Sequence, residues 1–198
     1  MSVRSVEKNY NFILPHDTAR LPTPWGVFDI FTVPSTIPES PQLVALNQHY
    51  REPHQPPLVR IHSECFTGDV LGSLRCDCRE QLHQSLKQIG NEGGILIYLR
   101  QEGRGNGLIN KLKAYQLQDW GLDTVEAQEQ LHLPVDDRDY KVAANILKDL
   151  GLTTIRLLTN NPGKIENLTS HGIITERLPL ESIPNQQNRR YLETKKNK

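Results

Sequence analysis

The chain has 198 residues, with 23 basic and 23 acidic side chains and a pI near 7.1. This balance produces no overall field that would attract nucleic acid or an anionic membrane, so an anionic ligand must be bound by local charge. No apolar stretch approaches the roughly 20 residues needed to span a bilayer, and the first ten residues lack the apolar segment of a signal peptide. We therefore expect a cytoplasmic protein without nucleic-acid or membrane partners.

The N-terminal part is rich in proline and β-like in pattern. Short apolar runs at 27–33 and 42–46 are separated by Pro-containing stretches, which is typical of strands joined by loops. We expect residues 1–20 to form an N-terminal extension, 21–184 the main domain and 185–198 a polar tail. A chain of this length can bury about 70% of its unfolded surface in one core.

From residue 57 onward, strand-like and helix-like patterns alternate. Buried strands are predicted at 58–62, 94–99, 154–158 and 173–177, and helices at 80–92, 107–120, 139–150 and 163–171. Gly151 is a plausible C-terminal cap of the third helix. The predicted fold class is α/β, a single layered domain with a mixed β-sheet flanked by helices and a β-rich N-terminal part.

All three cysteines, Cys65, Cys76 and Cys78, fall within fourteen residues. Structural zinc usually has four protein ligands, whereas catalytic zinc keeps three and leaves one position open, so three thiols favour a reactive metal. They could instead be buried apolar side chains, or a disulfide with one thiol left over, although Cys-x-Cys is too tight for an easy disulfide. His62 or His83 could also close a structural site as a fourth ligand.

Three polar loops follow predicted strands, where ligands gather in layered α/β folds. The first delivers Ser63, Glu64 and Cys65. The second, 100–108, combines Arg100 and Arg104 with three glycines and precedes a helix, so it is either an anion site or an ordinary strand-to-helix turn. The third, 159–164, could bring Lys164 to a phosphate, or could serve only to begin a helix with an Asn or Thr cap and Pro162 in the first turn.

The run Asp136-Asp137-Arg138-Asp139 also has two interpretations. Asp136 or Asp137 could cap the following helix. Arg138 could instead be a guanidinium oriented by carboxylates toward a substrate phosphate. Tyr115 lies on a predicted helix and belongs to the core unless its hydroxyl reaches a polar pocket.

Together these segments resemble one known family, GTP cyclohydrolase II. The resemblance covers about residues 20–196 and rests on motifs in matching order: Arg60-Ile-His-Ser-Glu-Cys-Phe-Thr-Gly-Asp, Ser73-Leu-Arg-Cys-Asp-Cys, Arg100-Gln-Glu-Gly-Arg, Asp123-Thr-Val-Glu-Ala, Asp136-Asp-Arg-Asp-Tyr and Leu158-Thr-Asn-Asn-Pro. Leu21-Pro-Thr-Pro-Trp-Gly and the segment from Asn185 to Lys195 resemble the family's first strand and its closing motif. The family opens the imidazole ring of GTP, releasing formate and pyrophosphate, as the first step of riboflavin synthesis.

The resemblance implies a role for each site residue. Cys65, Cys76 and Cys78 would hold one catalytic zinc ion per subunit, whose bound water attacks C8 of GTP. Asp136 corresponds to the proton acceptor and Tyr115 to a tyrosine near the zinc water. Arg138 corresponds to a proposed nucleophile, which we interpret as a stabiliser of transition-state charge because guanidinium is almost always protonated. The GTP site would be lined by Arg60, Ile61, His62, Ser63, Glu64, Gln81, Glu102, Gly103, Arg104, Thr124, Thr159 and Lys164.

The resemblance further implies magnesium with the triphosphate and a homodimer. Arg79, Glu80, Gln128 and Gly163 depart from common family residues, and the chain is too short for the dihydroxybutanone phosphate synthase domain that is often fused to this one, so we expect a stand-alone enzyme. Two other functions stay open. One is a paralogue that acts on a different nucleotide or heterocycle, and the other is a non-catalytic nucleotide-binding module with structural zinc.

Overall fold

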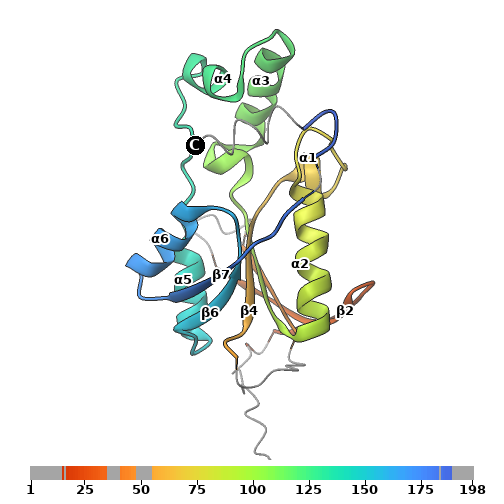
Figure 1. The fold of residues 1–198 in the computed structure, drawn as a ribbon, viewed down its shortest axis with the longest axis vertical. Helices are drawn as coiled ribbons and strands as arrows, with labels where there is room; N and C mark the ends of the chain where they lie inside the picture. Colours follow the sequence, from red (N-terminus) through yellow and green to blue (C-terminus); the bar gives the residue numbers. More distant parts are fainter. Residues whose placement is uncertain (1–14, 16, 35–40, 48–54, 183, 189–198) are drawn as a thin grey trace, which may run out of the picture. The chain divides into compact units, whose positions relative to one another are not determined.

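The computed structural model describes residues 15, 17–34, 41–47, 55–182 and 184–188 (Figure 1). These residues belong to two compact units. Unit 1 takes its residues from Met1–Ile61, Ser85–Tyr98 and Tyr140–Leu180, and unit 2 from His62–Gln84, Leu99–Asp139 and Glu181–Lys198. Most of the predicted N-terminal extension and of the polar tail lies outside the described residues.

A seven-stranded mixed sheet organises unit 1. Its strand order is β1-β2-β3-β5-β4-β6-β7, and its strands are β1 (Ala19–Thr23), β2 (Gly26–Val33), β3 (Gln42–Asn47), β4 (Leu58–Ser63), β5 (Gly94–Leu99), β6 (Thr154–Leu158) and β7 (Ile174–Leu178). The pairs β1–β2, β2–β3 and β3–β5 are antiparallel, whereas β4–β6 and β6–β7 are parallel. The prediction of a mixed α/β sheet is confirmed.

The central strands are apolar along their length, as expected for strands covered on both faces. Val44, Ile61, Ile95, Ile97 and Leu157 are fully buried. These side chains form the core of unit 1.

Three helices accompany the sheet. They are α2 (Cys78–Glu92), which begins among residues of unit 2, α5 (Lys141–Asp149) and α6 (Pro162–Ser170). Figure 1 shows α5 and α6 side by side next to β6 and β7. α5 is followed by Leu150 and then by Gly151, the predicted C-terminal cap, whose φ of +75° suits glycine and whose N–H donates to Lys148 O over 2.8 Å.

Unit 2 is built mainly from short helices. These are α1 (Phe66–Asp69), the 3₁₀-helix η1 (Glu102–Gly105), α3 (Gly107–Asp119) and α4 (Thr124–Gln130), and α3 packs against α4. Among its described residues, the buried apolar or sulfur-containing side chains are few: Cys65, Leu99, Ala114 and Ala127. An apolar core therefore contributes much less to unit 2 than to unit 1.

Most expected elements are present, with boundaries shifted by one or two residues. α2 begins at Cys78 rather than residue 80, and α5 begins at Lys141 rather than residue 139. β1 was expected only as a family-like strand entry, and α1, η1 and α4 were not predicted from the sequence.

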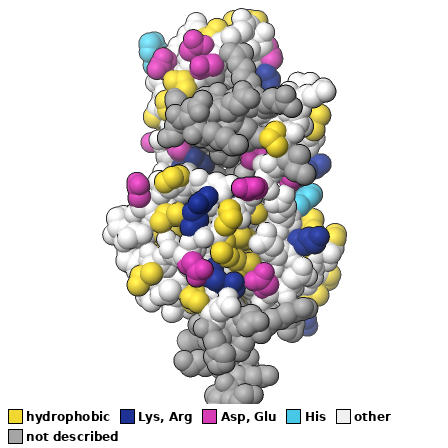
Figure 2. Space-filling view, in the orientation of Figure 1, with side chains coloured by type: hydrophobic (Ala, Val, Ile, Leu, Met, Phe, Trp, Pro, Cys, Tyr) yellow, Lys and Arg dark blue, Asp and Glu magenta, His cyan; other side chains and the backbone are white. Residues whose placement is uncertain are grey.

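The exposed side chains carry mixed charge. On the face drawn in Figure 2, Lys and Arg side chains are interspersed with Asp and Glu, which agrees with the balanced composition. In the described part of the chain, every helix is too short or too polar to cross a bilayer.

Candidate functional site

The three cysteines converge in unit 2. Cys65 precedes α1, and Cys76 and Cys78 lie just before and at the start of α2. Their sulfur atoms lie within 4.8 Å of one another, and the Sγ atoms of Cys65 and Cys76 are 3.7 Å apart. All three are free thiols, so the alternative of a disulfide with one thiol left over is wrong.

The geometry of this cluster fits a tetrahedral metal. Zinc–sulfur bonds of about 2.3 Å at tetrahedral angles place two sulfurs about 3.8 Å apart, close to the Cys65–Cys76 distance. Within the described residues, the group that could hold a metal contains these three cysteines, and neither His62 nor His83 belongs to it. Three ligands leave a fourth position open, as in catalytic zinc sites.

Gly68 makes this convergence possible. A Cβ atom at this position would lie 2.9 Å from the Sγ atoms of both Cys65 and Cys76, and 3.1 Å from Cβ of Cys78. These distances are shorter than a side chain can tolerate. Any residue larger than glycine would therefore push the sulfurs apart.

The three thiols influence one another's pKa, and Cys65 is the one most easily ionised. Hydrogen bonds from Cys76 and Cys78, assisted by the charge of Lys111, hold the pKa of Cys65 far below its usual range despite burial. The shared hydrogen bond with Cys65 raises the pKa of Cys76 to about 11, and the pKa of Cys78 is raised for the same reason. Metal binding must therefore displace protons from Cys76 and Cys78.

Two buried aspartates fix the segments that carry the cysteines. Asp69 accepts a hydrogen bond from the backbone N–H of Cys65 at 3.0 Å, and its two carboxylate oxygens lie 3.1 and 3.2 Å from Nε2 of His62. Asp77 accepts hydrogen bonds from the Gln81 amide and from Ser182 Oγ, the latter at 2.8 Å. Because both carboxylates are occupied in this way, they orient the ligand loops.

Glu102 and Lys111 form a buried pair beside the cluster. Lys111 Nζ lies 2.8 Å from Glu102 Oε1 and 3.1 Å from Cys65 Sγ, and Glu102 also accepts a hydrogen bond from the backbone N–H of Phe66. Burial alone would lower the pKa of Lys111, but Glu102 and Cys65 outweigh it and raise the pKa, so the ammonium group stays charged. The predicted substrate residue Glu102 is thus connected to a predicted metal ligand.

Tyr115 also reaches the cluster, through Thr67. Its hydroxyl lies 3.5 Å from Thr67 Oγ1, which lies 3.8 Å from Cys65 Sγ. The Arg75 guanidinium stacks 4.5 Å from the centre of the Tyr115 ring. Burial raises the pKa of Tyr115, so its hydroxyl is protonated at neutral pH and can donate a hydrogen bond.

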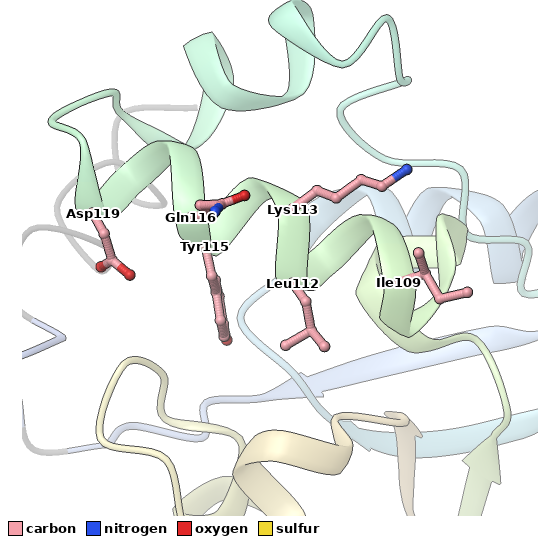
Figure 3. Close-up of a pocket in the computed structure, with 6 residues that line it drawn as sticks. All are labelled: Ile109, Leu112, Lys113, Tyr115, Gln116 and Asp119. Carbon is pink, nitrogen blue, oxygen red and sulfur yellow. The ribbon is translucent and has the colours of Figure 1, made fainter.

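An open hollow of about 530 Å³ runs along α3. Figure 3 shows Leu112 and Tyr115 pointing to the same side of this helix, and the complete lining is Ile109, Leu112, Lys113, Tyr115, Gln116 and Asp119. Tyr115 thus borders both the hollow and, through Thr67, the sulfur cluster.

The glycine-rich loop supports the acidic loop that follows α4. Arg104 has a positive φ of 60°, which is unusual for a residue with a side chain, and its carbonyl accepts a hydrogen bond from Asp137 N at 2.9 Å. A Cβ on Gly105 would lie 2.8 Å from Asp137 O. The glycine is therefore required because the backbone of the acidic loop approaches so closely.

Asp136 and Arg138 form an ion pair rather than a helix cap. α5 begins at Lys141 with Tyr140 as its cap residue and no capping side chain, whereas Asp136 accepts hydrogen bonds from the backbone N–H and the guanidinium of Arg138. Burial would raise the pKa of Asp136, but Arg138 outweighs it and lowers the pKa. Asp136 is therefore a carboxylate at neutral pH.

The remaining predicted residues of unit 2 are distributed along the same loops. Ser63 accepts a hydrogen bond from Gln101, and Glu64 pairs with Arg100 at 2.9 Å. Gly103 has a φ of +63° and donates its N–H to Glu102 Oε1. Thr124 is the first residue of α4.

Four predicted residues belong to unit 1, at the ends of β4 and β6 and in α6. Arg60 donates to Leu158 O at 2.8 Å, and Lys164 Nζ donates to Ile61 O at 2.7 Å and lies 5.1 Å from the Tyr140 ring centre. Thr159 Oγ1 accepts from the N–H of Asn161, whose own side chain does not cap α6. Pro162 opens the first turn of α6 as predicted. Arg60, Thr159 and Lys164 are all buried.

Sequence reasoning assigned no role to Gly68, Asp69, Asp77 or Lys111. The first two lie in the Cys-Phe-Thr-Gly-Asp motif and the third lies between two cysteines, so their positions were a usable signal. Lys111 had no comparable signal, because it joins the cluster only through the path of α3 in space.

The chain is similar to known proteins over most of its length. Residues 15–179 match the family described as GTP cyclohydrolase II. The riboflavin biosynthesis protein RibBA of Bacillus mycoides (strain KBAB4) is 52% identical over 180 residues, which cover 90% of this chain and 45% of that protein. RibBA of Bacillus cytotoxicus is 51% identical over 186 residues, covering 93% and 47%. The chain spans about half the length of these curated relatives.

One solved structure is also similar. The crystal structure of RibBX, a two-domain 3,4-dihydroxy-2-butanone 4-phosphate synthase from A. baumannii, matches with a TM-score of 0.44 and 18% sequence identity, covering 84% of this chain and 39% of that one.

Proposed function

Because the chain belongs to the GTP cyclohydrolase II family, we propose that it hydrolyses GTP by opening the imidazole ring, with release of formate and pyrophosphate, in the first step of riboflavin synthesis. The observation that carries this proposal is the three-sulfur cluster in unit 2. A sequence match alone would be compatible with a chain that had lost its metal site.

Cys65, Cys76 and Cys78 would hold a zinc ion as thiolates. The ion would supply Lewis acidity for the attack of water on C8 of GTP, which a neutral protein side chain cannot provide at pH 7. Gly68 keeps space for the sulfurs, and Asp69 and Asp77 hold the two ligand segments in place.

Asp136 and Tyr115 have protonation states that suit the roles proposed for them. The lowered pKa of Asp136 keeps it ionised, so its carboxylate can accept a hydrogen bond from the attacking water, although pairing with Arg138 makes it a weaker base, and the raised pKa of Tyr115 keeps its hydroxyl a donor. Arg138 is held in one orientation by Asp136 and would stabilise negative charge on a phosphate oxygen. Arg104 and Lys164, with magnesium, would balance further triphosphate charge.

Glu102 would be one of the residues that line the GTP site. It keeps its place because Lys111 and the backbone of Phe66 both donate to it. The other proposed contacts with GTP are made by Arg60, Ile61, His62, Ser63, Glu64, Gln81, Gly103, Thr124 and Thr159.

The test is mass spectrometry of products after incubation of the zinc-loaded protein with GTP and magnesium, beside Cys76→Ser. Formate and a diaminopyrimidine ribosyl phosphate from the unaltered protein, both lost in Cys76→Ser, would support the proposal. Intact GTP from protein with one bound zinc would refute it. Pyrophosphate and GMP from both proteins would also refute it, because phosphate cleavage would then occur without ring opening.

A further inference from the structure

Lys111 is a cationic residue whose side chain lies within hydrogen-bond distance of a cysteine sulfur. Its ammonium group donates to Cys65 Sγ at 3.1 Å and to Glu102 Oε1 at 2.8 Å. Its side chain and that of Glu102 are only 12% and 10% exposed. Both interactions are therefore shielded from solvent, where a charged hydrogen bond is stronger than at the surface.

The charge of the cluster gives this contact its importance. Three thiolates around a divalent cation carry one excess negative charge, and electron donation from three sulfurs weakens the cation as a Lewis acid. A hydrogen bond from a cation to one sulfur withdraws part of that electron density, as outer partners of metal ligands do in other sites. Lys111 is placed to act on Cys65 in this way.

On this basis we infer that Lys111 is a positioning residue of the metal centre, which holds Cys65 and Glu102 in a fixed relation and limits the charge that Cys65 donates to the metal. The inference rests on the proposed zinc site. Lys111 would then have two effects that can be separated experimentally, one on the sulfur of Cys65 and one on the carboxylate of Glu102.

The helix itself supports a specific role. Lys111 and Lys113 lie two residues apart on α3, yet Lys113 is exposed at the hollow and Lys111 is directed at the sulfur cluster. Lys111 Nζ also lies 5.8 Å from the centre of the Tyr115 ring. Lys113→Met is therefore a matched control for Lys111→Met, because the same change is made on the same helix away from the sulfurs.

The experiment uses cobalt(II) as a spectroscopic probe in place of zinc. In Lys111→Met, the sulfur-to-cobalt charge-transfer band should move to longer wavelength, because Cys65 becomes a better electron donor. Lys113→Met and Glu102→Gln should keep the band of the unaltered protein, and Lys111→Arg should restore most of it. With zinc, kcat should fall by about 10- to 100-fold in Lys111→Met, the usual range for loss of an outer partner of a metal ligand.

An unshifted band together with unchanged kcat in folded Lys111→Met would overturn the inference. An equal band shift in Glu102→Gln would overturn it too, because the effect would then pass through the carboxylate. If Lys111→Met does not fold, Lys111→Gln, which removes the charge but keeps an N–H donor, tests the charge by itself: a band at longer wavelength would support the inference, and an unshifted band with unchanged kcat would overturn it. A shifted band in a protein that leaves GTP intact would refute the proposed function while supporting the role of Lys111.

Discussion

Gly68 is the residue on which the sulfur cluster depends most directly. It lies in α1, and a methyl group there would overlap the sulfur atoms of Cys65 and Cys76. Because these sulfurs lie within 4.8 Å of one another and of Cys78 Sγ, they cannot swing away without losing the ligand geometry.

We predict that Gly68→Ala lowers zinc affinity by roughly 10-fold or more, a loss of the size seen when the surroundings of a metal site are altered. The measurement is competition with a chromogenic chelator. Gly163→Ala is the control, because Gly163 lies in α6 rather than α1 and a Cβ there would meet only the Asn161 side chain, at 3.4 Å. Equal zinc affinity in both variants would contradict the prediction.

The ion pair of Asp136 and Arg138 predicts a dependence of stability on pH. The folded-state pKa of Asp136 is lowered, so the pair stabilises the protein above the unfolded pKa of about 3.9 and loses this contribution as pH falls through the folded pKa. Arg138→Met should therefore cost about 0.5–1 kcal/mol at neutral pH, the upper range for partly exposed pairs, and progressively less as the pH falls below the unfolded pKa toward the folded one.

Denaturant unfolding at several pH values measures this effect. In the Asp136→Asn background, Arg138→Met should cost little at any pH, because the charge partner is already absent. A cost that stayed constant between pH 7 and pH 3 would show that Arg138 stabilises the loop through other contacts.

At the scale of secondary structure, α4 is a short helix that depends on its first turn. Asp123 accepts hydrogen bonds from the backbone N–H groups of Val125 and Glu126, at 2.7 and 2.9 Å, while Glu126 accepts one from the N–H of Asp123. This is a capping box. With only seven residues, α4 has few other hydrogen bonds to hold it.

Asp123→Ala should therefore destabilise α4 by about 1 kcal/mol, the usual cost of losing an N-terminal cap. The readout is hydrogen exchange of the Val125 and Glu126 amides, which should become faster. Asp149→Ala, at the exposed last residue of α5, should leave these amides unchanged. Unchanged exchange in Asp123→Ala would mean that packing against α3, rather than the cap, fixes the helix.

The elements that sequence patterns predicted are those whose own residues determine their structure. β5 and β6 have the predicted boundaries because each is a short apolar run flanked by Gly, Thr or charged residues. α1 and η1 were missed because neither has an apolar periodicity, and their shapes depend on distant contacts such as that of Phe66 with Glu102. α4 could have been found from Asp123 and Glu126, three residues apart.

The site residues, like the secondary-structure elements, divide into those that a local pattern indicates and those that depend on distant contacts. Spacing indicated the three sulfurs, and the polar loops after predicted strands indicated candidates such as Glu64, Arg104 and Lys164. Resemblance supplied the remaining candidates and the specific roles.

Asp69 and Asp77 lie inside the cysteine motifs and contact nearby residues, so their positions could have been read from the sequence. Lys111 contacts Cys65, which is 46 residues away, so no local pattern could reveal its role. Local reasoning also could not decide between a cap and an ion pair for Asp136, because the alternative depends on which backbone groups lie nearby in space.

At the scale of the whole molecule, the two units differ in what stabilises them. Unit 1 has a continuous apolar core, whereas unit 2 has few buried apolar side chains among its described residues and leaves several large ones exposed, including Leu71, Leu74, Ile109 and Trp120. A metal bound by segments before and after α1 would therefore supply much of the stability of unit 2.

Removal of the metal by a chelator should thus loosen unit 2 selectively. Hydrogen exchange in peptides covering 62–78 and 99–119 should accelerate by at least about 10-fold, equivalent to about 1.4 kcal/mol of local opening free energy, while β6 should stay protected. Cys76→Ser should show the fast exchange with or without chelator. Equal acceleration in both units would indicate that the metal stabilises the whole protein.

The mixed sheet also determines an order of assembly. The meander of β1, β2 and β3 joins neighbouring segments, but β4 pairs in parallel with β6, whose residues follow after about half of the chain: Leu58 lies opposite Arg156. Such non-local pairing has a high entropic cost of loop closure and forms slowly. During synthesis, one edge of the apolar strand β4 therefore stays uncovered until β6 has been made. A chain that stops before β6 leaves this edge exposed to other chains. The main consequence of such a truncation is therefore aggregation through β4, rather than the loss of any single contact.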